Sequence, residues 1–167
     1  MVAVFAYDPT DWHDLFVAGA GAGAALAGLV FVAVSINIER ILKFSGLPER
    51  ALQTVLLLLT VVVISIIGLI PGQDHHALGI ELLIAGLSFS VVIWMAALRA
   101  MPSGKEPRMW LTERLVILTW GTLPFVIGGL SVLVANGAGL YWVVLGMVGA
   151  IVGAVANAWV LLVEILR

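Results

Sequence analysis

The sequence predicts an all-α membrane protein, a polytopic bundle of five transmembrane helices that forms one domain over residues 1–167. Hydrophobic residues make up 62% of the 167 residues and charged residues only 11%, whereas an ordinary soluble domain is about a quarter charged. So few polar groups could not cover the surface of a water-soluble domain of this size. The chain also contains five apolar runs of about the length that crosses a bilayer.

The predicted spans are bounded by charged residues, proline or glycine, and short connections join them. They cover about residues 15–38, 51–70, 78–98, 111–134 and 140–166. Asp8 supplies a capping oxygen and Pro9 suits the first helical turn, so we expect the first helix to begin near Pro9. We expect this helix to continue through Phe44 until Gly46 ends it, and Pro48 to open the second helix.

The basic residues predict the orientation of the chain in the membrane. All eight lie on one side of the predicted topology, at Arg40, Lys43, Arg50, Arg99, Lys105, Arg108, Arg114 and Arg167. The other side carries all three histidines and the acidic residues Asp8, Asp11, Asp14, Asp74 and Glu81. By the positive-inside rule, the N-terminus is expected outside and the C-terminus in the cytoplasm. Five spans agree with this, because an odd number of spans leaves the two termini on opposite sides.

Several function classes are disfavoured by composition. The chain has no cysteine, which excludes thiolate metal sites and cysteine nucleophiles. Its net charge of -2 argues against a nucleic-acid partner. The polar residues near the predicted midplane are not ionisable, which disfavours an ion-coupled transporter and an intramembrane enzyme. They are Thr60, Ser65, Ser88, Ser90 and Thr122. We expect no enzyme activity and no cofactor.

Small residues recur at helical spacing in the first and fifth spans. In the first span they include Gly21, Ala25 and Gly28, and in the fifth they are Gly146, Gly149 and Gly153. Such stripes let another backbone approach closely in lipid. Because both spans run in the same direction, we expect them to pack in parallel, within one subunit or between neighbours. The alternative is that one of them lines a narrow pathway.

Three polar residues accompany these stripes, and they are candidates for the same pore or packing role. Ser35 and Asn37 lie toward the inner end of the first span, and Asn157 lies toward the inner end of the fifth. A carboxamide in lipid is unfavourable unless it is paired. Asn37 and Asn157 should therefore face protein or water, and pairing with each other is one such arrangement.

The outer side gathers residues that suit a divalent metal, namely His13, Asp14, His75 and His76. Their spacing lacks the i, i+4 pattern of a helical zinc motif, so no metal site is predicted from it. Imidazoles among carboxylates also suit a proton sensor. The favoured interpretation is a solvated rim with helix-capping carboxylates.

Three stretches of the first two spans carry a family resemblance: residues 12–17 (WHDLFV), 24–37 (AALAGLVFVAVSIN) and 68–73 (GLIPGQ). In these stretches the chain resembles a set of small bacterial multi-pass membrane proteins of uncharacterised function. The resemblance implies a bacterial cytoplasmic membrane and brings no catalytic or binding residues.

The sequence suggests two functional hypotheses. The first is a homo-oligomeric passive channel or pore, because five short spans enclose little by themselves. The second is an accessory or assembly subunit that binds another membrane protein through its small-residue faces. The expected partners are the lipid bilayer, further copies of the chain and, for the second hypothesis, another membrane protein.

Overall fold

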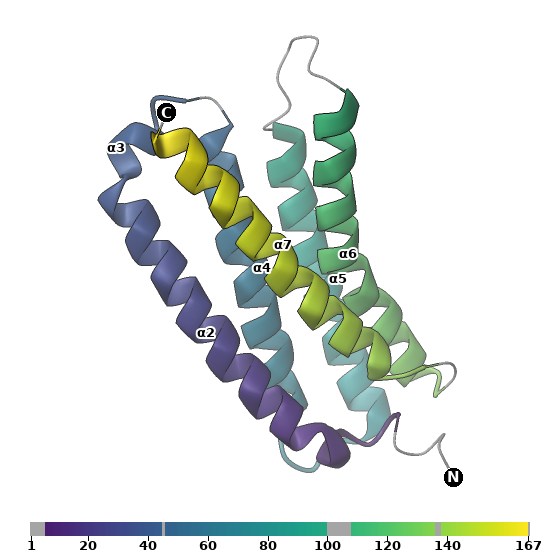
Figure 1. The fold of residues 1–167 in the computed structure, drawn as a ribbon. Coiled ribbons are helices and arrows are strands. Elements are labelled where there is room, and N and C mark those ends of the chain that lie inside the picture. The colour runs from purple at the N-terminus through teal and green to yellow at the C-terminus, as the bar shows by residue number, and fades with distance from the viewer. Residues whose placement is uncertain (1–5, 45, 100–107, 136–137, 167) are drawn as a thin grey trace.

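A computed structural model describes residues 6–44, 46–99, 108–135 and 138–166, and the side chains of all of these except residues 108–114 and 164–166. The elements follow in the order η1 (Pro9–Trp12), α2 (His13–Ile36), α3 (Ile38–Ile41), α4 (Leu47–Gly68), α5 (His75–Arg99), α6 (Arg108–Leu133) and α7 (Tyr141–Leu166) (Figure 1).

Five segments of the described chain are long and apolar enough to cross a membrane, which confirms the predicted all-α class and the predicted number of spans. Their bounds differ from the prediction by a few residues. Polar residues at the ends extend α5 from His75 to Arg99, beyond the apolar run at 78–98. Pro48 lies in the first turn of α4, as predicted, after Gly46 adopts a positive φ of 86° that favours glycine.

The chain enters the bundle through the predicted cap, with one difference. The Asp8 carboxylate accepts a hydrogen bond from the Thr10 backbone N–H at 2.9 Å, and Pro9 follows in the first turn. This turn is a 3-10 helix, η1, and the α-helix begins at His13.

The prediction that the first helix continues through Phe44 is wrong, because α2 ends at Ile36 and α3 is a separate short helix. Asn37 explains the break. Its side-chain Nδ2 donates to the Ala33 carbonyl oxygen at 2.9 Å, the acceptor that its own backbone N–H would use in a continuous α-helix. The backbone N–H bonds to the Val34 carbonyl instead, at 3.2 Å. Side chains that compete for backbone acceptors in this way disrupt helices.

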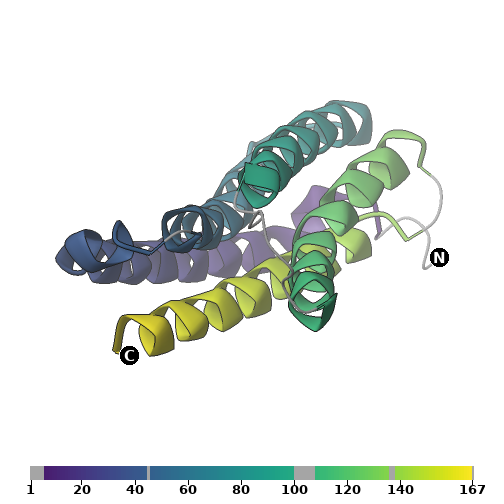
Figure 2. The same cartoon turned by 90° about the horizontal axis from the view of Figure 1, so that it is seen from above.

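The four helices α4, α5, α6 and α7 form a closed ring in which each packs on the next and α7 returns to α4. Helix α2 lies outside this ring against α4 and barely touches α7, as the views in Figures 1 and 2 show. Within the chain, the prediction that the first and fifth spans pack along each other is therefore wrong. Short connections force successive helices of the ring to run antiparallel. Helices α2 and α7 both pack on α4 and make few contacts with each other.

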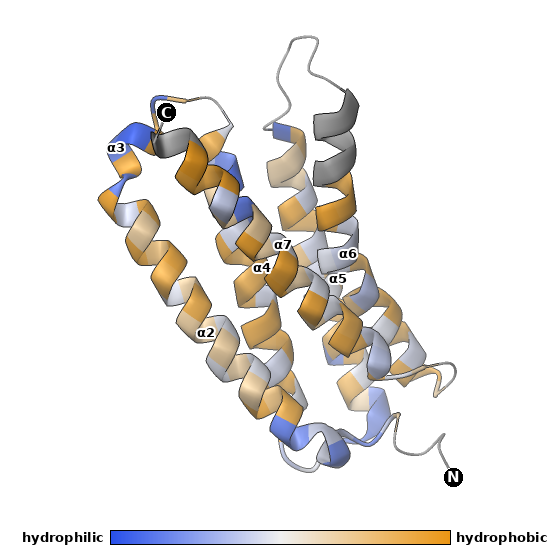
Figure 3. Ribbon diagram, in the orientation of Figure 1, coloured by the Kyte–Doolittle hydropathy of each residue, from blue (hydrophilic) through white to orange (hydrophobic). Residues whose placement is uncertain are grey.

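The interior of the ring is closely packed and largely apolar. The largest fully buried side chains include Leu57 and Ile64 from α4, Leu82 from α5 and Phe125 from α6, each at most 1% exposed. The outer surface is apolar as well, with Leu29, Ile36 and Trp159 each more than 60% exposed (Figure 3). Water would not solvate such a surface, which suits contact with lipid.

The two ends of the bundle differ in charge. The basic end, which carries Arg40, Lys43, Arg50 and Arg99, is at the top of Figure 1. The histidine end, with His13, His75 and His76, is at the bottom. The helical backbones of Arg108 and Arg114 start α6 at the basic end, whereas Lys105 and Arg167 lie outside the described residues.

Helices α5 and α6 approach each other through glycines. A Cβ atom added to Gly129 would lie 2.6 Å from the Leu83 backbone nitrogen, and one added to Gly79 would lie 2.6 Å from the Leu133 Cα atom. Backbone atoms cannot give way as a flexible side chain can. The two helices would have to move apart to admit even a methyl group.

We therefore expect Gly79→Ala and Gly129→Ala each to lower the free energy of unfolding by about 1–3 kcal/mol, the usual effect of overpacking. Thermal unfolding of the purified protein in detergent measures this change. Ser88→Thr is the control, because Ser88 is an exposed position on α5 and the added methyl group lies at the surface. An equal loss of stability in all three variants would contradict the assignment of this contact to Gly79 and Gly129.

Candidate functional site

Helix α2 carries small residues on two faces, and only one of them packs against another helix of the described chain. Gly19 and Gly23 face α4, where an added Cβ atom would lie 2.6 Å from the Ser65 Oγ atom and 2.9 Å from a Val62 methyl carbon, respectively. Gly21 is exposed, and an added Cβ atom there would meet nothing within 4 Å.

The unused face runs the length of α2 at intervals of three and four residues. Its members are all exposed: Ala18, Gly21, Ala25, Gly28, Val32 and Ser35. We call this set the small-residue face of α2. It contains all the predicted packing or pore residues that lie within α2, and nothing in the described chain covers it. The Ser35 hydroxyl donates to the Phe31 carbonyl oxygen at 2.8 Å, so the polar group is satisfied inside its own helix.

The predicted stripe on α7 is already occupied by α6. A Cβ atom added to Gly146 would lie 2.9 Å from the Phe125 ring, and one added to Gly153 would lie 2.7 Å from a methyl carbon of Ile117. Gly149 faces the Trp120 carbonyl oxygen. Pro124, four residues after Trp120, has no N–H to donate to that carbonyl, and the absent side chain of Gly149 lets α7 approach it. These glycines pack helices inside the chain.

Asn37 and Asn157 are not paired with each other. Asn37 bonds to its own helix, as described above, and Asn157 is a buried residue of α7. Helix α4 instead brings Gln53, 1% exposed, to the level of Asn157. Leu57 of α4 lies against Gly153 of α7, and the two helices run antiparallel. One turn further toward the basic end, α4 carries Gln53 and α7 carries Asn157, so these two residues lie at the same level.

Gln53 is a polar residue that sequence reasoning missed. It falls inside the apolar run at 51–70, and a carboxamide within a span is the signal that could have identified it. Its Nε2 atom is buried and has no hydrogen-bond partner among the described residues, and the same is true of the Ser65 Oγ atom. Other hydroxyls of α4 are satisfied, since Thr54 and Thr60 each donate to the carbonyl four residues earlier at 2.8 Å.

The histidine end does not gather its candidate ligands around one point. The His13 Nδ1 atom lies 3.4 Å from an oxygen of its neighbour Asp14, and both side chains are exposed. The rings of His75 and His76 contact each other at an interplanar angle of 37°, with centroids 4.1 Å apart. Among the described residues, no three histidine, aspartate or glutamate side chains are arranged to hold a metal ion.

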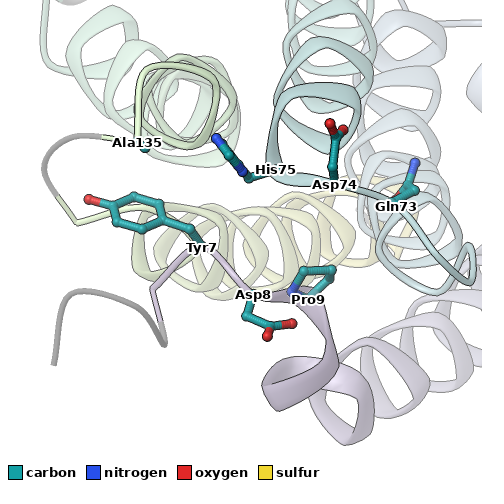
Figure 4. A pocket seen from close by; sticks show the side chains of 7 residues that line it. All are labelled: Tyr7, Asp8, Pro9, Gln73, Asp74, His75 and Ala135. Carbon is teal, nitrogen blue, oxygen red and sulfur yellow. The ribbon is translucent and has the colours of Figure 1, made fainter. Parts of the chain in front are cut away.

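A cavity of about 540 Å³ opens at the same end (Figure 4). It is lined by Tyr7, Asp8, Pro9, Gln73, Asp74, His75 and Ala135. The carboxylates of Asp8 and Asp74 point away from each other in Figure 4, and each serves as a cap. Asp8 accepts from Thr10, and Asp74 accepts from the Ala77 backbone N–H at 2.8 Å.

The charges around this cavity agree with a solvated rim. Hydrogen bonds from the Thr10 side chain and backbone hold the pKa of Asp8 below its usual value, so Asp8 is ionised at neutral pH. The Gln73 side-chain amide donates to the Glu81 carboxylate. The carboxylates of Asp8 and Asp74 thus stabilise the turns that carry them, whereas the Gln73 Oε1 atom is buried without a hydrogen-bond partner among the described residues.

The unpartnered Gln53 generates a prediction about stability. A buried donor without an acceptor costs about 1–3 kcal/mol, so we expect Gln53→Leu to leave the free energy of unfolding unchanged or to raise it. Thr54→Val, which removes a satisfied hydroxyl on the same helix, should lower it by about 1 kcal/mol. Thermal unfolding in detergent compares the two variants. If Gln53→Leu is the less stable of the two, the Gln53 amide does have a partner in the folded protein.

Comparisons of the chain with protein-family models, with curated proteins and with solved structures give no match.

Proposed function

We propose that the protein is a homo-oligomeric passive channel of the bacterial cytoplasmic membrane, in which the small-residue face of α2 contacts neighbouring subunits. The main observation in favour of this proposal is that α2 is more exposed than the other four spans. Only 11% of its spanning segment is buried, against 28–56% in the other four spans. A helix so rich in glycine and alanine gains little from lipid contact and allows another backbone to approach closely.

A pathway between subunits suits this fold better than a pathway through one subunit. The ring of α4, α5, α6 and α7 is filled at its centre by Leu57, Ile64 and Phe125, which are at most 1% exposed. Native interiors packed in this way leave no room for a file of water. Copies of α2 that meet through small side chains would leave a narrow space between them without disturbing the ring.

The residues along α2 suit a passive pathway. The face is apolar from Ala18 to Val32 and ends toward the basic end with the hydroxyl of Ser35. Apolar constrictions gate by dewetting, and polar rings at a pore mouth help a solute to shed its water. Because none of these groups is ionisable, the proposal does not include coupling to an ion gradient.

The proposal includes the orientation of the bundle in the membrane. The basic end carries Arg40, Lys43, Arg50 and Arg99, which by the positive-inside rule places it in the cytoplasm and the histidine end outside.

An accessory or assembly subunit is the second candidate. The same open space at Gly21 and Gly28 would accept a helix of another membrane protein. This candidate differs from the first in its expected partner, which would co-purify with the chain in mild detergent, and in the absence of flux through the purified protein.

The test combines oligomeric state with flux. We expect the purified protein to be an oligomer in mild detergent and to pass ions or small solutes when reconstituted in liposomes. Gly21→Leu and Gly28→Leu should reduce both properties, because the larger side chain blocks close approach of α2. Ser35→Ala, which removes the one hydroxyl of the face at nearly constant volume, should alter flux with the oligomer retained. Ser88→Leu, an exposed position on α5, is the matched control and should change neither.

Two results would refute the channel. One is the absence of flux across a range of pH values from liposomes that contain correctly folded protein. The other is an oligomer that is disrupted by Ser88→Leu as strongly as by Gly28→Leu. A monomer that retains a distinct membrane protein, and loses it on Gly28→Leu, would instead support the accessory role.

A further inference from the structure

The break at Asn37 creates a separate structural unit at the basic end. Helix α3 follows the break, and Ile41, 1% exposed, anchors it in a small core with Leu47 and Ala51 of α4 and Leu161 of α7. One side of this short segment is thus fixed to the bundle. The segment is held close to α4 and α7 and does not extend from α2 as a continuous helix.

The residues around this anchor are exposed and of two kinds. Leu42 is 66% exposed and Phe44 is 53% exposed, while Arg40 and Lys43 are exposed cations. We call these four residues the interfacial patch, and Figure 3 shows hydrophilic and hydrophobic residues mixed in this region. Neither cation forms a salt bridge or a side-chain hydrogen bond within the described residues. The acidic neighbour, Glu39, is also exposed, and the segment keeps a net positive charge.

The length of the first span places this patch at the membrane boundary. The segment Pro9–Ile36 has 28 residues, which at about 1.5 Å per residue is about 42 Å long, against a hydrocarbon core of about 30 Å. Residues 40–44 come after the end of this segment and therefore lie at the depth of the lipid headgroups. At that depth apolar side chains reach the acyl chains, and cations meet phosphates.

We propose that the interfacial patch binds the headgroups of anionic phospholipids in the leaflet at the basic end. Arg40 and Lys43 provide two cations that no carboxylate of the described chain neutralises, so their charge is complementary to a lipid phosphate. Leu42 and Phe44 insert beside them among the acyl chains. This pairing of large apolar side chains with free cations suits a lipid surface better than a soluble anion, which would leave both apolar side chains in water.

The test measures lipid retention by the full-length protein. Native mass spectrometry counts bound phosphatidylglycerol and phosphatidylcholine after both are added to the protein in neutral detergent. We expect selective retention of phosphatidylglycerol, and we expect R40Q/K43Q to weaken it on the order of tenfold, since each cation near a membrane surface contributes appreciably. Leu42→Ser combined with Phe44→Ser should weaken the retention of both lipids.

Controls separate this site from general electrostatics. Arg99→Gln removes an exposed cation at the same end but outside the patch, and it should retain phosphatidylglycerol better than either Arg40→Gln or Lys43→Gln alone. Inorganic phosphate at the same concentration should not raise the unfolding temperature, whereas phosphatidylglycerol should. Circular dichroism of each variant confirms that the fold is kept, and the single variants remain informative should R40Q/K43Q fail to fold.

Three outcomes would overturn the proposal. The first is equal retention of phosphatidylglycerol by R40Q/K43Q and the natural sequence. The second is an equal loss in Arg99→Gln, which would assign the effect to overall charge. The third is a change in oligomeric state in R40Q/K43Q without any change in lipid per chain, which would assign the patch to a contact between copies.

Discussion

In a bilayer, apolar side chains gain little by leaving lipid for the interior of a protein, so helices associate mainly where their backbones can come close. The five spans meet this condition at glycines. Gly79 and Gly129 join α5 to α6, and Gly149 joins α7 to α6. Gly23 joins α2 to α4, where an added Cβ atom would lie 3.3 Å from the Leu58 carbonyl oxygen. The arrangement of the helices depends on these contacts.

Several hydroxyl groups of the bundle are satisfied within their own helix. Ser90 and Thr122 each donate to the carbonyl four residues earlier in the same helix, at 2.6 and 2.7 Å, which satisfies a hydroxyl in lipid without a second helix. The Trp94 indole N–H reaches the Thr122 hydroxyl from α5 at 3.4 Å, a long hydrogen bond between helices. Close packing at glycine therefore joins α5 to α6, α6 to α7 and α2 to α4.

The sequence was sufficient for the spans because span length and hydropathy are local properties. It was also sufficient for the two charged ends, since each connection between spans must emerge at one end. Neighbours were harder to predict. The stripe at Gly146, Gly149 and Gly153 indicates that a backbone can approach α7, but a glycine carries no side chain that specifies which backbone. The stripe was predicted to meet the first span, and it meets α6.

The break at Asn37 was missed for a different reason. Charged residues continue the helical pattern beyond it, and a side chain that competes with its own backbone leaves no change in hydropathy. Among the site candidates, the exposed face at Gly21, Ala25 and Gly28 could be listed from spacing alone. The sequence could not predict that this face is exposed, because exposure depends on which of the two small-residue faces of α2 packs against α4.

The polarity of the buried residues in the ring of four helices changes along its axis, and this change limits where a solute can pass. Near the histidine end its interior is sealed by Leu78, Leu82 and Val132, all fully buried. Near the basic end the buried residues include Gln53 and Asn157. Gln53 and Asn157 can admit water to a limited depth. To continue, water would have to displace several closely packed apolar side chains at once, which the density of a native interior opposes. Contact between copies of α2 requires no such displacement, because the small-residue face of α2 is separate from the packing that stabilises the ring.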